Sequence, residues 1–193
     1  MMALLLSATP ASAHTGLAGG FGAGFAHPWN GADHMLAMIA VGIWGAILGR
    51  PLIYLLPVVF PLVMVVGAEL AMFGMTMPPV EIGVALSVTA LGLCIACGFR
   101  APTWMACAIV GCFGLLHGVA HGAELPTATD PLGYASGFVL ATGSLHLLGI
   151  GLGRFDRRIL RLAGGAICLA GCWFLSALIL VASLHFVTPD HLE

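Results

Sequence analysis

The sequence contains no lysine, and charged residues make up only 7% of its 193 positions. Soluble domains carry roughly 25% charged residues, so this chain cannot cover itself with a water-soluble surface. Hydrophobic residues account for 60% of the chain instead, and the formal net charge is −2 without any basic run. Nucleic-acid binding needs such a run or patch. The composition therefore predicts an integral membrane protein whose environment is the lipid bilayer and which has no nucleic-acid partner.

Other signatures are missing as well. The six cysteines all lie inside apolar segments, so we expect small buried hydrophobic residues and no secreted disulfide framework. There is no P-loop, which excludes ATP hydrolysis by this chain as a source of energy. There is no HExxH motif of the zinc peptidases. These absences disfavour nucleotide-driven pumps and the common metallopeptidases.

Long apolar runs occupy most of the chain instead. A membrane-spanning helix needs about 20 apolar residues, because about 30 Å of hydrocarbon is crossed at 1.5 Å per residue. We therefore expect an all-α, polytopic membrane protein with one transport domain over residues 14–193. Its six transmembrane helices are predicted at about residues 32–49, 52–75, 80–99, 102–124, 131–153 and 159–187.

Glycine is abundant, with 27 residues. Small residues spaced four apart let membrane helices approach closely. The fourth predicted span carries a doubled GxxxG pattern at Gly114, Gly118 and Gly122. The same spacing recurs in the pairs Gly45/Gly49, Gly133/Gly137 and Gly149/Gly153. We interpret these glycines as helix-packing positions in a glycine-rich bundle.

Residues 1–13 resemble a short signal peptide. They contain the apolar run Leu4–Leu6 and end in Ala11–Ala13, which has the A-x-A form of a cleavage site, but they lack the basic start. Cleavage after Ala13 would leave His14 at the mature N-terminus, where its amine and imidazole form a metal-chelating pair. The alternative interpretation is an ordinary residue after a cleavage site.

All six arginines fall in alternate loops between the predicted spans. Cytoplasmic loops are enriched in lysine and arginine. Arg50 follows the first span, Arg100 follows the third, and the remaining four arginines lie between the fifth and sixth spans. This pattern predicts that these loops are cytoplasmic and that both termini are periplasmic, as removal of a signal peptide would also require.

Two polar motifs then fall at the outer ends of the first and fourth spans. Ionisable residues inside a bilayer are costly and usually mark an ion pathway. Imidazoles combined with carboxylates suit nickel, cobalt, zinc or copper, whereas magnesium and calcium prefer oxygen ligands. We therefore predict a metal site at this depth. Its candidate ligands are His27, Asp33, His34, His117, His121 and Glu124.

The geometry of the two motifs differs. Residues 117, 121 and 124 share one helix face. Asp33 and His34 are adjacent and diverge by about 100° in a regular helix. One way to use both is for His34 to bind the ion while Asp33 fixes its tautomer through a hydrogen bond. Pro28 and Gly31 are expected to form a turn, with Asn30 or Asp33 capping the following helix.

Three further residues are candidates of second rank. One is His14 at the mature N-terminus. Glu69 lies in the outer part of the second span, where a buried carboxylate could partner the histidines or the ion. His146 lies deeper, on the fifth span. It could be a relay site or a hydrogen-bonded packing residue.

A family resemblance rests on two stretches, His27-Pro28-x-x-Gly31-x-Asp33-His34-x-Leu36-Ala37-Met38 with Val41-Gly42, and His117-Gly118-x-Ala120-His121-Gly122-x-Glu124. On these motifs the sequence resembles the HupE/UreJ family of nickel/cobalt permeases, membrane proteins accessory to hydrogenase and urease. The resemblance covers nearly the whole chain. It implies nickel or cobalt uptake across a bacterial inner membrane and a functional role for the six polar residues of the two motifs.

The expected function is thus secondary transport by a protein that is not an enzyme and holds no prosthetic group. The substrate, Ni²⁺ or Co²⁺, would be bound transiently. A divalent cation moving inward gains about 4.6 kcal/mol per 100 mV of membrane potential, which is enough to drive uptake. Two alternatives use the same histidines, a membrane-embedded metal-dependent hydrolase and a bis-histidine haem protein.

Overall fold

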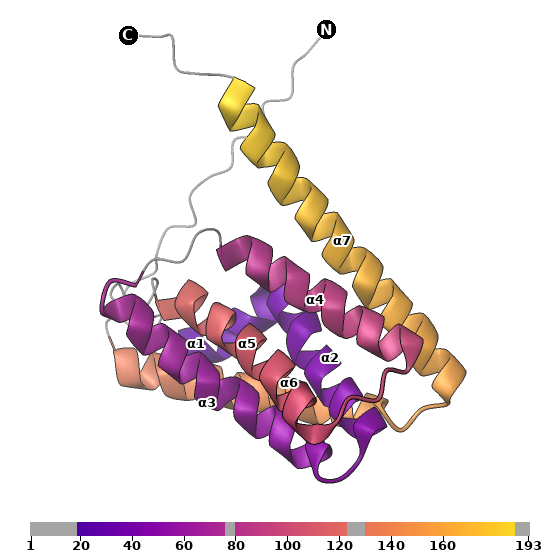
Figure 1. The fold of residues 1–193 in the computed structure, drawn as a ribbon. Helices are drawn as coiled ribbons and strands as arrows, with labels where there is room; N and C mark the ends of the chain where they lie inside the picture. The colour runs from indigo at the N-terminus through magenta and orange to yellow at the C-terminus, as the bar shows by residue number, and fades with distance from the viewer. Residues whose placement is uncertain (1–18, 76–79, 123–129, 188–193) are drawn as a thin grey trace, which may run out of the picture.

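The computed structural model describes residues 19–75, 80–122 and 130–187, with side chains described up to residue 183 (Figure 1). The described residues form helices and no strand. The helices are α1 (Phe21–Asn30), α2 (Ala32–Leu48), α3 (Leu52–Met72), α4 (Val80–Cys97), α5 (Thr103–Gly122), α6 (Pro131–Leu152) and α7 (Arg157–Val187).

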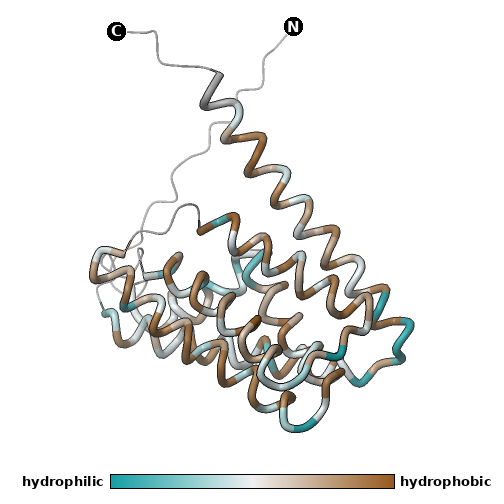
Figure 2. The backbone as a smooth tube through the Cα atoms, in the orientation of Figure 1, coloured by the Kyte–Doolittle hydropathy of each residue, from teal (hydrophilic) through white to brown (hydrophobic). Residues whose placement is uncertain are grey.

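Helices α3 to α7 are each long and apolar enough to cross a membrane. Helices α1 and α2 pass the same test only as a pair, and they are bent by 84° where they meet. The chain is therefore an all-α, multi-pass membrane protein with five spans, or six when the bent pair counts as one. Apolar residues run along the lengths of the helices (Figure 2).

The region before the first predicted span differs from expectation. Residues 21–30 form helix α1, with Pro28 inside it, and the turn is confined to Gly31, whose φ of −94° and ψ of 108° are extended. The predicted cap is wrong, because Gly31 itself holds the N-cap position of α2 and no side chain caps the helix. Asp33 instead accepts the backbone N–H of His34 within the first turn.

The predicted glycine packing is confirmed between α3 and α5, which lie side by side. A Cβ added at Gly118 would overlap the carbonyl oxygen of Met64 on α3. Gly114 and Gly122 meet the α3 backbone one turn to either side. Glycines also let α2 and α6 touch, since a Cβ at Gly42 would overlap the carbonyl oxygen of His146. These contacts hold the polar residues of α5 and α6 at fixed positions beside α3 and α2.

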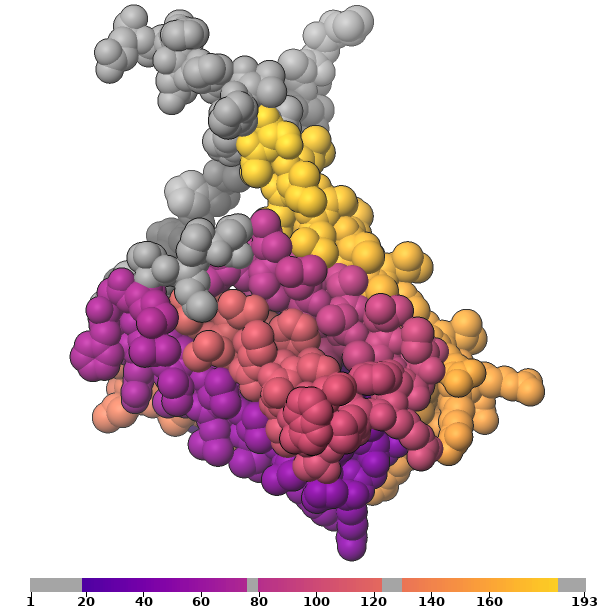
Figure 3. All heavy atoms as spheres, viewed as in Figure 1, coloured from indigo at the N-terminus to yellow at the C-terminus, as the bar shows by residue number. Residues whose placement is uncertain are grey.

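Helix α7 packs along α4 and then continues beyond the bundle (Figures 1 and 3). Its apolar side chains, such as Trp173 and Leu169, are largely exposed, as suits a surface that faces lipid. The cysteines are less buried than expected. Cys97, Cys112 and Cys172 are exposed, because each lies on the outer face of its helix.

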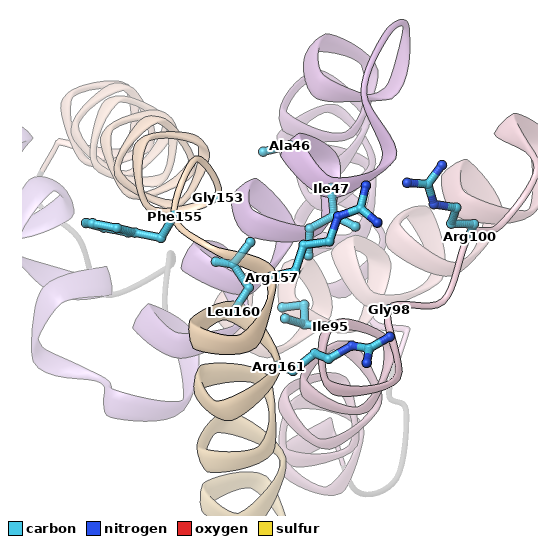
Figure 4. Close-up of a pocket in the computed structure, with 10 residues that line it drawn as sticks. All are labelled: Ala46, Ile47, Ile95, Gly98, Arg100, Gly153, Phe155, Arg157, Leu160 and Arg161. Atoms are coloured by element: carbon cyan, nitrogen blue, oxygen red, sulfur yellow. The ribbon is translucent and has the colours of Figure 1, made fainter.

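Arginines from different loops gather at one end of the bundle. A cavity of about 230 Å³ lies between the ends of α2, α4, α6 and α7 (Figure 4). Arg100, Arg157 and Arg161 line it, from the α4–α5 connection and the first turns of α7. Two of the three loops that carry arginine in the sequence, those of Arg100 and Arg157, thus meet in space.

Candidate metal-binding site

The bend between α1 and α2 brings two histidines together. His27 lies near the end of α1 and His34 in the first turn of α2, with ring centroids 6.4 Å apart. Both line a broad depression of about 540 Å³ that also includes Asp33 and Tyr134. The first motif therefore forms the wall of an open vestibule.

Helix α5 supplies two more rings, one turn apart. The centroid of His34 is 5.0 Å from that of His117 and 4.5 Å from that of His121, and His27 lies 4.7 Å from His121. We call these four residues the outer histidine cluster. Exposure falls along it, from 15% for the His34 side chain to 5% for His121 and zero for His117. The cluster leads from the vestibule into the protein interior.

Hydrogen bonds fix the tautomers of two of these rings. Nδ1 of His34 lies 2.9 Å from Oδ1 of Asp33, and Nδ1 of His117 lies 2.9 Å from the carbonyl oxygen of Phe113. Carbonyl and carboxylate oxygens only accept hydrogen bonds, so each Nδ1 carries a proton, and in the neutral imidazole each Nε2 keeps its lone pair. Both Nε2 atoms are buried and make no hydrogen bond to any residue that the structure describes. Histidines that bind metals are held in this way.

The spacing of the rings suits a shared ion. Two imidazoles that bind one ion at 90–110°, with nitrogens about 2 Å from it, have centroids about 4.5–5 Å apart. The His34–His117 and His34–His121 distances fall in this range. Within the described ranges, however, no three His, Cys, Asp or Glu side chains together surround one point. Binding by three or more of them therefore requires the rings to turn.

The other candidates have different placements. Glu124 and His14 lie outside the described residues. Glu69 is exposed on α3, so the expectation of a buried carboxylate is wrong. His146 is completely buried on α6, and neither of its ring nitrogens makes a hydrogen bond to a described residue. Its role as a relay site or as a packing residue stays a prediction.

Sequence reasoning missed the aromatic residues around the cluster. The Phe138 ring lies 4.6 Å from that of His121 and 5.7 Å from that of His27, and Tyr134 lies 6.0 Å from His27. Tyr134, Phe138, Thr142 and His146 follow each other at intervals of four, so that each lies one turn beyond the last in a stripe that winds slowly around α6. This spacing ends at His146, a polar residue in an apolar span, and could have indicated from the sequence that the aromatic residues lie near the cluster.

Comparisons with known proteins place the chain in a family. The family described as HupE / UreJ protein matches residues 2–174. Protein HupE of Rhizobium leguminosarum bv. viciae is 44% identical over 176 residues, which cover 88% of this chain and 92% of that protein. No solved structure matches the chain. Family match and identity agree over nearly the whole length, and the chain belongs to the HupE/UreJ family.

Proposed function

We propose that this protein is a permease that takes up a divalent transition-metal ion, nickel or cobalt, across the bacterial inner membrane. The observation that carries the proposal is the pair of buried Nε2 atoms of His34 and His117, which have lone pairs but no hydrogen-bond partner among the described residues. An apolar interior leaves such atoms unsatisfied at a cost. A transition-metal ion satisfies both, and imidazole selects it over magnesium and calcium.

Uptake begins in the vestibule beside His27 and Asp33. The hydrated ion exchanges water for imidazole nitrogens as it moves from the partly exposed His34 to the fully buried His117. Asp33 stays hydrogen-bonded to His34, which raises the basicity of Nε2 and adds negative charge near the ion. The membrane potential supplies the driving force, about 4.6 kcal/mol per 100 mV for two charges.

The orientation follows from the arginines. The end of the bundle that carries Arg100, Arg157 and Arg161 would face the cytoplasm. The outer histidine cluster lies toward the start of α2 and the end of α5, which is the opposite end of the bundle. The vestibule would therefore open to the periplasm, where the ion is captured.

A hydrolase with the same cluster is less well supported. Such an enzyme needs a general base beside a metal-bound water. Asp33 is the carboxylate that lies against the described histidine rings, and its Oδ1 already accepts both the backbone N–H and the Nδ1–H of His34. Its geometry serves to orient an imidazole.

The test is uptake of ⁶³Ni²⁺ by metal-limited cells that produce His34→Ala or His117→Ala. Each change removes one buried Nε2, so we expect uptake to fall to the level of cells without the protein. His185→Ala, near the C-terminal end of α7, is the matched control and should transport normally. Wild-type uptake by both cluster variants, at equal amounts of folded protein in the membrane, would refute the assignment.

A further inference from the structure

A second set of unsatisfied polar groups lies deeper in the bundle. His146 and Thr142 are both completely buried on α6. Neither ring nitrogen of His146 nor Oγ1 of Thr142 makes a hydrogen bond to any described residue. The two are four residues apart and so lie on one face of the helix. Leaving three buried polar atoms unpaired is costly and calls for an explanation.

A backbone oxygen of α3 faces the same place. Pro61 has no N–H, so the carbonyl group of Pro57, four residues earlier, receives no helical hydrogen bond. This carbonyl lies next to the His146 ring and interacts with it, although the contact does not have the geometry of a full hydrogen bond. His146 therefore has a buried hydroxyl one helical turn away on α6 and, on α3, a carbonyl oxygen that lacks its helical partner.

One ring separates this place from the outer histidine cluster. Phe60, fully buried on α3, has its ring centroid 5.2 Å from that of His117 and 5.5 Å from that of His146. It meets His146 edge-on, at 90°. The Phe60 side chain would thus separate an ion held by His117 from His146.

We propose that His146, Thr142 and the carbonyl oxygen of Pro57 form an inner binding site for a divalent transition-metal ion, which Phe60 separates from the outer histidine cluster. The role of this ion as a transported substrate rests on the proposed function. The binding of an ion at this site does not. The imidazole favours a transition metal over magnesium or calcium. All three ligands are neutral, so the site binds more weakly than one with carboxylates nearby, and conduction needs a site that the ion can leave.

The experiment is equilibrium dialysis of the purified full-length chain in lipid nanodiscs against Ni²⁺ alone, with the bound metal counted per chain. Four proteins are compared with the wild type. They are the inner-site variants His146→Leu and Thr142→Val, the outer-cluster variant His117→Leu, and the control Ser144→Ala. Ser144 lies on the same helix, but its hydroxyl is already bonded to the Ala141 carbonyl.

We expect two ions per wild-type chain and two for Ser144→Ala. His146→Leu should lose the more weakly bound ion, and His117→Leu should lose the other. In Thr142→Val, the weaker site should fill only at a higher Ni²⁺ concentration. A wild type that binds one ion, which His146→Leu keeps, would overturn the inner site. If the wild type binds one ion, and this ion is lost in His146→Leu but kept in His117→Leu, the result would support the inner site and refute the outer one.

Folding is checked by the unfolding temperature of each variant. If the imidazole of His146 serves only packing, leucine should lower this temperature and leave the number of bound ions unchanged, which would overturn the proposal. If it is a ligand, leucine removes unsatisfied buried nitrogens, and we expect an unchanged or higher unfolding temperature together with the lost ion. If His146→Leu does not fold, the near-isosteric Thr142→Val still tests the proposal, because it should raise the Ni²⁺ concentration at which the weaker site fills.

Discussion

The hydrogen bond between His34 and Asp33 determines which nitrogen of His34 is available to an ion. In a regular helix these neighbours diverge by about 100°, yet Nδ1 of His34 lies 2.9 Å from Oδ1 of Asp33. The contact forms in the first turn after the break at Gly31. In the proposed site Asp33 would therefore act through His34, which explains how two adjacent residues can serve one site.

Asp33→Asn tests this role. The amide keeps the size of the side chain but loses the charge, and its oxygen is a weaker acceptor for Nδ1–H. Loss of such a supporting carboxylate typically weakens metal binding about 10- to 100-fold. We expect the Ni²⁺ concentration for half-maximal uptake to rise by that order, with transport retained at high Ni²⁺. Asp156→Asn, which alters a carboxylate at the arginine end of the bundle, should leave this concentration unchanged.

Complete loss of uptake at every Ni²⁺ concentration would contradict this prediction, because it would show that Asp33 is itself indispensable to the ion. An unchanged Ni²⁺ concentration for half-maximal uptake would also contradict it, because it would show that the Asp33 carboxylate does not support binding.

Among the helices, the contact between α3 and α5 sets the position of two cluster histidines. His117 and His121 flank Gly118, whose missing side chain lets α5 lie directly on the Met64 carbonyl of α3. His117 also contacts Phe60 of α3. A change in the spacing of these helices would therefore move the outer cluster and the ring that separates it from His146.

Gly118→Ala is the corresponding prediction. The added Cβ would overlap the carbonyl oxygen of Met64, which belongs to the rigid backbone of α3. Overpacking of this kind typically costs about 1–3 kcal/mol. We expect a lower unfolding temperature for the purified protein and reduced uptake. Gly143→Ala, at a position on α6 with nothing within 4 Å of an added Cβ, is the matched control and should be unchanged. Equal unfolding temperatures for Gly118→Ala and Gly143→Ala would contradict the prediction, because they would mean that α3 and α5 can move apart without loss of stability.

The sequence predicts most helices well, because hydropathy and charge decide where a chain can enter lipid. Spans α3 to α6 lie within a few residues of their predicted limits. Helix α1 was missed since its ten residues are too short to span a membrane and include glycines and Pro28. Its packing on α6 comes from contacts between distant residues, as where a Cβ at Gly24 would overlap the Tyr134 carbonyl.

The same limit applies to the site. Spacing on one helix predicts that residues 117 and 121 share a face, because that depends only on the helical period. It does not show that the Phe60 ring lies between His117 and His146, which requires three helices to be placed together. Nor does it show that Glu69 is exposed, since the side on which a span meets its neighbours is set by glycine contacts along α3 and α5.

For the whole molecule, the arrangement of polar groups implies a direction. Arginines gather at one end of the bundle and the vestibule opens at the other. Between them lie, in order, the outer histidine cluster, Phe60 and His146. An ion that follows these residues moves toward the arginine end. Since cytoplasmic loops are the ones enriched in arginine, the proposed movement would be uptake.

This direction depends on the topology of the chain in the membrane, which reporter fusions can measure. We expect alkaline phosphatase, which is active only in the periplasm, to be active when fused after residue 193 and inactive when fused after Leu162, in the first turns of α7, so that all four arginines precede the reporter. A green fluorescent protein, which folds in the cytoplasm, should give the opposite result. The reason is that Arg154, Arg157, Arg158 and Arg161 resist translocation across the membrane. The reverse pattern would place the vestibule in the cytoplasm, and the outer histidine cluster would then be an exit for the ion rather than its point of capture.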